Sequence, residues 1–371
     1  MPLRANCNAV QRGFKGRGAA ENPQNRFEEW ARIHEETAEQ DDAAPRTVVA
    51  VQRAASIVTR NDSPDVPFKQ SINPYLGCEH GCVYCFARPS HAYLGLSAGL
   101  DFETHLFAKQ NAPELLRREL SRPGYRCEVI ALGTNTDPYQ PIERRHRITR
   151  ALLEIMLEFR QPVRIVTKLA LVELDADLLE ELARHQLAEV MFSVTSMDAE
   201  LARKLEPRAA APYRRIESIR RIFEAGVRCG VLVAPVIPFL NDGDLEEVLR
   251  AAREAGARTA GYVAVRLPRE VKELFKEWLE RHYPMKSERI MARVRDLHGG
   301  REYDASWGRR MSGAGVYGSL LRRRFASACA RFGLETGARG NISSRRNFAS
   351  PPVDRLRFSR PARCMEAPKP V

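Results

Sequence analysis

From Pro67 onward, short runs of β-branched and other apolar residues alternate with segments whose apolar residues recur at helical spacing. This alternation is typical of repeated βα units, which build a parallel sheet because each helix returns the chain to the edge where the next strand begins. Six runs predict strands, at Lys69–Pro74, Glu128–Gly133, Val163–Thr167, Val190–Thr195, Arg228–Val236 and Thr259–Val265. Between them, helices are predicted at Ala112–Leu120, Ile148–Phe159, Asp175–Arg184, Tyr213–Ala225 and Asp244–Ala255.

The number of these units defines an α/β fold class and limits its architecture. Six strands are too many for a small βαβ module and too few to close an eightfold barrel. The count therefore favours a partial (β/α)6 barrel, similar to an incomplete TIM barrel. A doubly wound open sheet is the alternative, because hydrophobic periodicity does not distinguish strand orders.

The 371-residue chain is predicted to divide into four regions. Residues 1–60 form an irregular N-terminal extension with one helix, at Arg26–Glu39, and we expect this extension to wrap the main domain. Residues 61–300 form the barrel. Residues 301–340 form a basic helical region, with a helix at Leu320–Phe332 that begins with three arginines. Residues 341–371 form an unstructured tail, because their composition is polar and rich in proline.

The positive charge of the chain is concentrated at its C-terminal end. The whole chain has 59 Lys and Arg against 47 Asp and Glu, a net charge of +12, whereas residues 301–371 alone have 15 basic and 5 acidic residues. A basic region of this kind predicts an anionic partner such as DNA or RNA, bound through Arg322, Arg323, Arg324, Arg345 and Arg346. A solvated basic face is the alternative.

The hydrophobic pattern predicts no contact with a membrane. The longest nearly unbroken apolar stretch, from Gly230 to Leu240, is interrupted by Pro235 and Pro238 and is shorter than the roughly 20 residues of a membrane span. The first residues include positive charges but no apolar segment follows them, so a secretory signal is not expected. We therefore expect a cytoplasmic protein.

Three of the eight cysteines form the pattern C-x3-C-x2-C at Cys78, Cys82 and Cys85, directly after the first predicted strand. Loops at the carboxyl ends of barrel strands build active sites, and glycines at 77 and 81 allow the tight backbone that three converging thiolates need. Three thiolates are one short of a closed zinc or iron–sulfur site. One interpretation is a structural zinc with His80 or His91 as fourth ligand. The other is an iron–sulfur cubane whose fourth iron binds a small molecule.

An aromatic residue, Tyr84, stands directly before the last of these cysteines. The motif resembles that of the radical S-adenosylmethionine (SAM) superfamily. The resemblance implies a [4Fe–4S] cluster held by Cys78, Cys82 and Cys85, with SAM bound to the remaining iron and Tyr84 among the cofactor-binding residues. It also implies a reducing partner such as flavodoxin or ferredoxin, and cleavage of SAM to methionine and a 5′-deoxyadenosyl radical that abstracts a substrate hydrogen. The cofactor would supply the difficult chemistry while the barrel excludes solvent.

Further stretches resemble the subgroup related to spore photoproduct lyase, often labelled DNA repair photolyase. They are Thr134–Glu143, Ile165–Lys168, Phe192–Thr195 with Leu205–Arg208, and Ala234–Asp242. In this resemblance Lys168 and Ser193 match positions that bind SAM, and Asn135 and Thr195 are adjacent candidates. The structural alternatives are a surface charge at Lys168 and hydroxyls on alternate sides of a strand at Ser193 and Thr195.

The sequence departs from that subgroup at one position. The lyase carries a hydrogen-donating cysteine in the loop after its second strand, whereas Gly133–Asp137 contains none, and Cys127 lies at the other end of that strand. The resemblance therefore implies a radical SAM enzyme of lyase or DNA-repair type without assigning its reaction. A second hypothesis is a nucleic-acid-binding protein whose zinc or iron–sulfur site is only structural.

Overall fold

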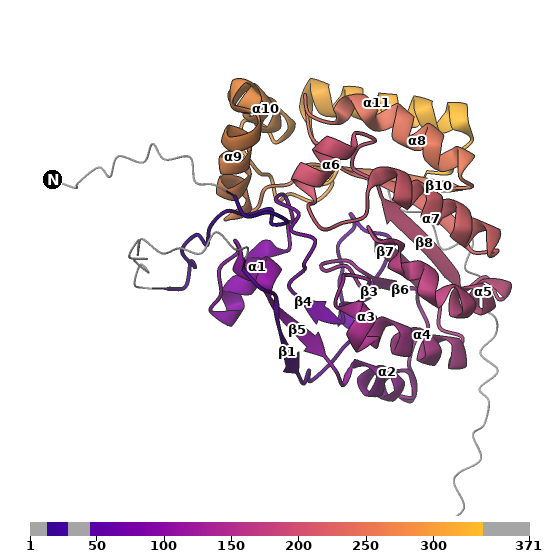
Figure 1. Ribbon diagram of the computed structural model, residues 1–371. Coiled ribbons are helices and arrows are strands. Elements are labelled where there is room, and N and C mark those ends of the chain that lie inside the picture. Colours follow the sequence, from indigo (N-terminus) through magenta and orange to yellow (C-terminus); the bar gives the residue numbers. More distant parts are fainter. Residues whose placement is uncertain (1–12, 29–44, 337–371) are drawn as a thin grey trace, which may run out of the picture.

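The computed structural model describes residues 13–28 and 45–336, and a seven-stranded sheet crosses it (Figure 1). Six of its strands are parallel, and each lies within two residues of a predicted strand. They are β3 (Gln70–Ile72), β6 (Ile130–Leu132), β7 (Val163–Thr167), β8 (Ala188–Ser193), β9 (Arg228–Val236) and β10 (Thr259–Ala264). The predicted α/β class is therefore confirmed.

The order of the strands decides between the two predicted architectures. From one edge to the other the sheet runs β10, β9, β8, β7, β6, β3 and then β2 (Thr59–Arg60), which pairs antiparallel with β3. The six parallel strands follow their order in the sequence without a reversal. A doubly wound sheet requires such a reversal at its switch point, so this alternative is wrong.

The helices that connect the parallel strands pack against one another in sequence order. All five predicted helices are present, as α2 (Ala112–Leu120), α4 (Ile148–Glu158), α5 (Ala176–Arg184), α7 (Pro212–Glu224) and α8 (Leu245–Glu254). Contacts join α2 to α4, α4 to α5, and α7 to α8 (Figure 1). Their apolar faces and the strands bury one large hydrophobic core, which includes Leu116, Leu152, Ile165, Val190 and Val231.

Several short elements between these units were not predicted. They are α1 (Asp101–Thr104), α3 (Glu143–His146), α6 (Ala199–Leu205) and three 3-10 helices, η1 (Arg88–Leu94), η2 (Ala170–Asp175) and η3 (Asp242–Asp244). After the last strand the chain forms two longer helices, α9 (Val271–His282) and α10 (Pro284–Leu297). Trp278 and Ile290 of these helices belong to a second hydrophobic cluster that also includes Cys82 and Tyr84. This cluster connects the end of the domain to the cysteine motif.

The N-terminal region is more regular than the sequence predicted. Residues 48–52 form β1 (Val48–Gln52), which pairs in parallel with β5 (His105–Lys109), and β4 (Tyr75–Leu76) pairs antiparallel with β5. This three-stranded sheet joins segments that are distant in the sequence, so local periodicity did not indicate it. Most of the helix predicted at Arg26–Glu39 and the whole tail at 341–371 lie outside the described residues.

The predicted C-terminal helix is observed as α11 (Gly315–Phe332), which packs against α8 and α10. Beyond it, Glu335 donates its backbone N–H to the carbonyl of Arg258 at 2.8 Å, and its carbonyl accepts from Ala260 N–H at 2.9 Å. These bonds fasten the end of the described chain to the edge of β10. Within the described residues, no helix has both the length and the apolar composition that crossing a membrane requires.

Candidate radical SAM site

The three motif cysteines lie in the loop between β4 and η1, at the carboxyl end of β3. Gly81 in this loop has a φ of 66°, and a Cβ there would lie 2.7 Å from a carboxylate oxygen of Glu103. A Cβ on Gly18 would lie only 1.7 Å from the carbonyl oxygen of Gly81. Both positions therefore require glycine, and the N-terminal segment lies in direct backbone contact with the cysteine loop.

A fully buried ion pair supports the loop from inside. Arg88 and Glu103 are both 0% exposed and lie 2.5 Å apart. Arg88 also donates to the carbonyl of Cys82 at 2.8 Å, and Glu103 accepts from the backbone N–H groups of Gly18 and Ala19 at 3.0 and 2.9 Å. Each charge is therefore paired and hydrogen-bonded, which a buried ion pair needs in order not to destabilise the fold.

The three thiols are held away from water. Cys78 and Cys82 are buried and Cys85 is half-buried. Burial raises the pKa of all three, that of Cys82 to about 12, while backbone N–H groups of Asp137 and His80 act in the opposite direction on the pKa of Cys78. Without a metal these thiols are protonated near neutral pH, and a bound metal would replace their protons.

The donor set of this loop fits an iron–sulfur cluster. Clustered thiolates are soft ligands that favour iron–sulfur and zinc centres, and backbone N–H groups directed at a ligand sulfur stabilise its negative charge. Within the described residues, no three His, Cys, Asp or Glu side chains are already gathered around the position of a single ion. The fit therefore rests on the type, number and burial of the donors.

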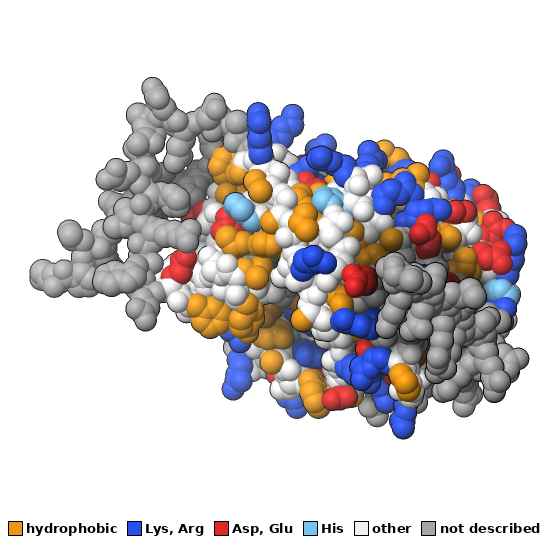
Figure 2. Space-filling model, turned by 90° about the horizontal axis from the view of Figure 1, so that it is seen from below, with side chains coloured by type: hydrophobic (Ala, Val, Ile, Leu, Met, Phe, Trp, Pro, Cys, Tyr) orange, Lys and Arg blue, Asp and Glu red, His pale blue; other side chains and the backbone are white. Residues whose placement is uncertain are grey.

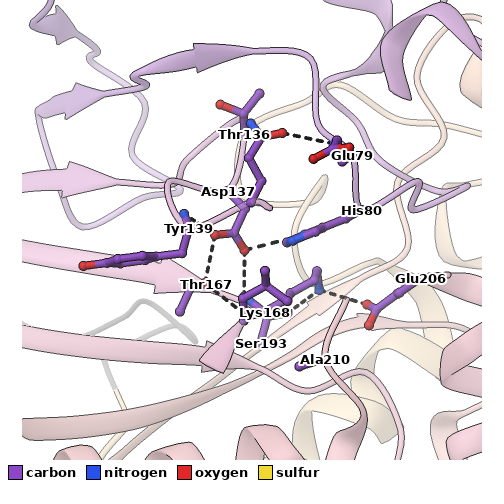
Figure 3. Close-up of polar contacts among 12 residues, drawn as sticks. Glu79, His80, Thr136, Asp137, Tyr139, Thr167, Lys168, Ser193, Glu206 and Ala210 are labelled. Carbon is purple, nitrogen blue, oxygen red and sulfur yellow. Dashed lines mark hydrogen bonds and ion pairs between the residues drawn. The ribbon is translucent and has the colours of Figure 1, made fainter. Parts of the chain in front are cut away.

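Beside the loop, a polar network centres on the buried carboxylate of Glu206, which is 1% exposed. Lys168, directly after β7, places its Nζ 2.9 Å from Glu206 Oε1 (Figure 3). Arg215 of α7 forms an ion pair with the other oxygen of this carboxylate. Burial raises the pKa of Glu206, but the charges of Arg215 and Lys168 outweigh it and hold that pKa well below its usual range. The carboxylate is therefore charged at neutral pH.

Hydroxyl groups of three other elements complete this network. Ser193, the last residue of β8, accepts from Lys168 Nζ at 2.7 Å. Thr195 donates to Glu206 at 2.5 Å, and the hydroxyl of Tyr84 donates to the same carboxylate. The ring of Tyr84 also lies 5.8 Å from Lys168 Nζ. Tyr84 thus connects the cysteine loop to the strand ends that hold Lys168 and Ser193.

A second carboxylate, that of Asp137, positions the backbone at these strand ends. Its oxygens accept from Thr167 Oγ1 at 2.8 Å and from Lys168 N–H at 2.7 Å, and His80 Nδ1 lies 3.6 Å away (Figure 3). Burial lowers the pKa of His80, and its Nε2 has no hydrogen-bond partner within the described residues. The cysteine loop, β6 and β7 therefore meet at Asp137.

The structure brings together most of the predicted cofactor-binding residues. Tyr84, Lys168, Ser193 and Thr195 all contact the Glu206 network. Asn135 does not share these contacts: its side chain is exposed, and its backbone N–H donates to Asn73 at 2.9 Å. The sequence analysis did not single out the residues that organise the site, Glu206, Arg215 and Asp137. Two of them stand inside the quoted stretches Leu205–Arg208 and Thr134–Glu143, which was the available signal.

The other described cysteines lie away from this site. Cys127 comes before β6 and donates to Gln161 at 3.6 Å, and Cys229 is near the start of β9. Both are at the amino ends of the strands, opposite the cysteine loop. Cys329 is buried in α11.

Comparison with known families agrees with this geometry. Residues 72–252 match the model of the radical SAM superfamily. An uncharacterised protein of Mycobacterium tuberculosis (strain H37Rv) is 35% identical over 271 residues, which are 72% of this chain and 76% of that protein. An uncharacterised protein of Methanocaldococcus jannaschii is 27% identical over 216 residues, 58% of this chain and 77% of that protein. The chain belongs to the radical SAM superfamily.

Solved structures resemble the chain in fold. A mutant of spore photoproduct lyase is 18% identical with a TM-score of 0.54, and the match covers 78% of this chain and 80% of the lyase. Another mutant, with bound AdoMet and dinucleoside spore photoproduct, is 17% identical with a TM-score of 0.53 over the same shares. The α/β fold is thus similar to the partial barrel of a radical SAM enzyme.

Proposed function

We propose that this chain holds a [4Fe–4S] cluster with Cys78, Cys82 and Cys85 and reductively cleaves SAM at the carboxyl ends of a partial (β/α)6 barrel. One observation carries the proposal. Tyr84, between two of the cysteines, donates to Glu206, and the same carboxylate holds Lys168. The metal-binding loop and the cofactor-binding residues are thereby parts of one buried network.

The charges of the network suit the carboxylate of SAM. Glu206 is one negative charge shared by two cations, Arg215 and Lys168, so one positive charge remains unbalanced. Lys168 is the more accessible of the two, since its side chain is 16% exposed and that of Arg215 is 1% exposed. We assign Lys168 to the carboxylate of SAM, and the hydroxyls of Ser193 and Thr195 to its orientation. Asn135 remains a candidate from the adjacent loop.

When bound together and reduced, the cluster and SAM supply a 5′-deoxyadenosyl radical for hydrogen abstraction. The chain positions these groups and excludes water, because the ion pair of Arg88 and Glu103 fixes the loop and apolar residues cover Cys82. The electron is proposed to come from a flavodoxin or ferredoxin. Cys85 is the least buried of the three ligands, which makes its side of the loop the place for that partner to approach.

A nucleic acid is the proposed substrate, in a reaction of lyase or DNA-repair type. The basic C-terminal region supports this with Arg322 and Arg323, which are exposed on α11. Arg324 does not contribute in the same way, because it is paired with Glu246 at 2.7 Å. Arg345 and Arg346 lie outside the described residues.

Anaerobic reconstitution with iron and sulfide tests the proposal. About four irons and four sulfides per chain are expected, and dithionite with SAM should then release 5′-deoxyadenosine and methionine. One zinc per chain without SAM cleavage would contradict the proposal and favour a structural metal in a nucleic-acid-binding protein. Candidate nucleic acids, examined by mass spectrometry after anaerobic turnover, would then identify the substrate.

A further inference from the structure

A cavity of about 430 Å³ lies beside the cysteine loop, and the proposed function does not use it. Its walls come from the N-terminal segment, the start of the region before β1, and two loops of the candidate site. Four cationic side chains and one carboxylate line it: Lys15, Arg17, Arg46, Arg208 and Glu79. Its volume is within the range of about 300–1,000 Å³ that small-molecule sites occupy.

The cavity shares its walls with the candidate SAM site. Glu79 directly follows the proposed cluster ligand Cys78, and Arg208 stands two residues after Glu206. A backbone hydrogen bond of 3.2 Å, from Arg208 N–H to the carbonyl of His80, joins the two segments. A molecule bound in the cavity would therefore be held directly beside the residues proposed to bind the cluster and SAM.

Two guanidinium groups meet at one hydroxyl in this cavity. Thr47 Oγ1 accepts from Arg17 at 3.1 Å and from Arg208 at 3.4 Å, and it donates to Glu79 at 2.8 Å. Arg17 is fixed further by the carbonyls of Glu103 and Pro45, at 3.0 and 2.5 Å. The two arginines are thus held in place before any ligand binds, which lowers the entropic cost of binding.

The positive charges of the cavity are only partly compensated. Glu79 lies 3.0 Å from Arg208 and balances one of them. The hydrogen bonds of Arg17 within the described residues go to neutral oxygens. Burial, and after it the repulsion from Arg208, lowers the pKa of Arg17. Lys15 and Arg46 are exposed and add two more charges at the rim. An anion at this place would relieve the repulsion between the cations.

We propose that this cavity binds a phosphate group of the substrate. The inference rests on the proposed function, because the bound phosphate would place the substrate beside the SAM site. Guanidinium groups match phosphate oxygens in two-pronged hydrogen bonds, and the lysine ammonium adds a point charge. The phosphate is either a diester of a nucleic acid or a monoester of a nucleotide, since both present the same oxygens to the arginines.

Equilibrium binding to the full chain, measured by calorimetry, tests this site. The protein is reconstituted anaerobically, kept without reductant, and saturated with SAM so that the nucleoside probes do not occupy the SAM site. The probes are cytidine monophosphate, the dinucleotide CpC, and cytidine as a neutral control. At least one of the two phosphate probes should bind tenfold or more tightly than cytidine, and its affinity should fall as salt is raised. Preference for CpC indicates a nucleic-acid backbone, and preference for the monophosphate indicates a nucleotide.

Variants at the rim separate the cavity from other basic surfaces. The Lys15→Gln and Arg46→Gln double variant changes exposed side chains, and phosphate affinity should fall about tenfold. A matched control, Lys286→Gln with Arg145→Gln, removes two exposed charges elsewhere and should change affinity less than twofold. Equal affinity of wild type and rim variant, or equal affinity for phosphate probes and cytidine, would overturn the inference.

The same preparation distinguishes this result from a failure of the proposed function. SAM cleavage by the wild-type chain is measured separately after dithionite is added. Cleavage without phosphate binding refutes only the cavity. Phosphate binding without cleavage refutes only the proposed function.

Discussion

Replacing Glu206 by glutamine removes the negative charge on which the candidate site is organised. The side chain keeps its shape and one carbonyl oxygen, so Lys168, Thr195 and Tyr84 retain an acceptor. Arg215 loses its ionic partner while it is 1% exposed. The substitution therefore leaves a guanidinium buried without a compensating charge, and we expect the free energy of unfolding to fall.

The size of this effect follows from the burial of the pair. Removing one partner of a buried ion pair costs about 3–5 kcal/mol, and the remaining amide acceptor places the expected loss near ~3 kcal/mol. The matched control is Glu217→Gln, because Glu217 forms helix-surface pairs with Arg220 and Arg221 and is 41% exposed. A solvated pair contributes about 0–1 kcal/mol, so the control should lose less than ~1 kcal/mol.

The pH dependence gives an independent test of the same reasoning. The native pKa of Glu206 is below its usual value, since burial raises it but Arg215 and Lys168 lower it more strongly. A depressed native pKa stabilises the fold fully above the unfolded pKa of a glutamate, about 4.3, and this contribution is lost as pH falls toward the native value. The difference in unfolding free energy between wild type and Glu206→Gln should therefore be constant near pH 7 and shrink below pH ~4.

Urea denaturation of the full chain, followed by circular dichroism at several pH values, measures both quantities. The metal content of each sample is determined first, so that a difference in cluster loading is not mistaken for a difference in stability. A Glu206→Gln variant as stable as wild type at pH 7 would refute the interpretation of Glu206 as a compensating charge. An undiminished difference in acid would refute its depressed pKa.

Three further predictions concern the cluster, SAM and nucleic acid. Alanine at any one motif cysteine should abolish the brown colour and iron content of the reconstituted protein, because two thiolates do not hold a cubane stably, whereas Cys127→Ser should retain both. Lys168→Ala should keep the iron but weaken SAM binding by about 2–5 kcal/mol in calorimetry, and an unchanged affinity would remove Lys168 from the site. Neutralising Arg322 and Arg323 should flatten the salt dependence of oligonucleotide binding by about 0.7–0.9 log units per phosphate contact in anisotropy titrations; an unchanged slope would refute this role for α11.

The sequence allowed the main sheet to be predicted because its strands are continuous apolar runs. Runs such as Val163–Thr167 and Arg228–Val236 are recognisable without knowledge of their neighbours, and the structure has the same boundaries. The pairing of β1 with β5 could not be predicted in this way. Val48 and Val51 are exposed, so β1 has no buried face to reveal it, and its partner lies far along the chain.

The candidate site was only partly predictable for a related reason. The cysteine spacing is a local pattern, and it indicated the loop directly. The role of Arg215 depends on burial, which a local pattern does not report. Helix α7 contains Arg214, Arg215, Arg220 and Arg221, and only Arg215 among them is buried. Nothing in the sequence distinguishes it from the arginines that face solvent.

The way the parallel sheet ends at its two edges affects how safely the chain can exist before a cofactor binds. An open strand edge is a template for pairing with another chain and hence for aggregation. At one edge the antiparallel β2 is only two residues long. At the other, Glu335 occupies hydrogen-bonding groups along β10 and is held by Arg228 at 2.5 Å. The last described residues thus act as a guard against strand exchange, and a chain shortened to Gly333 would present β10 as an unprotected edge.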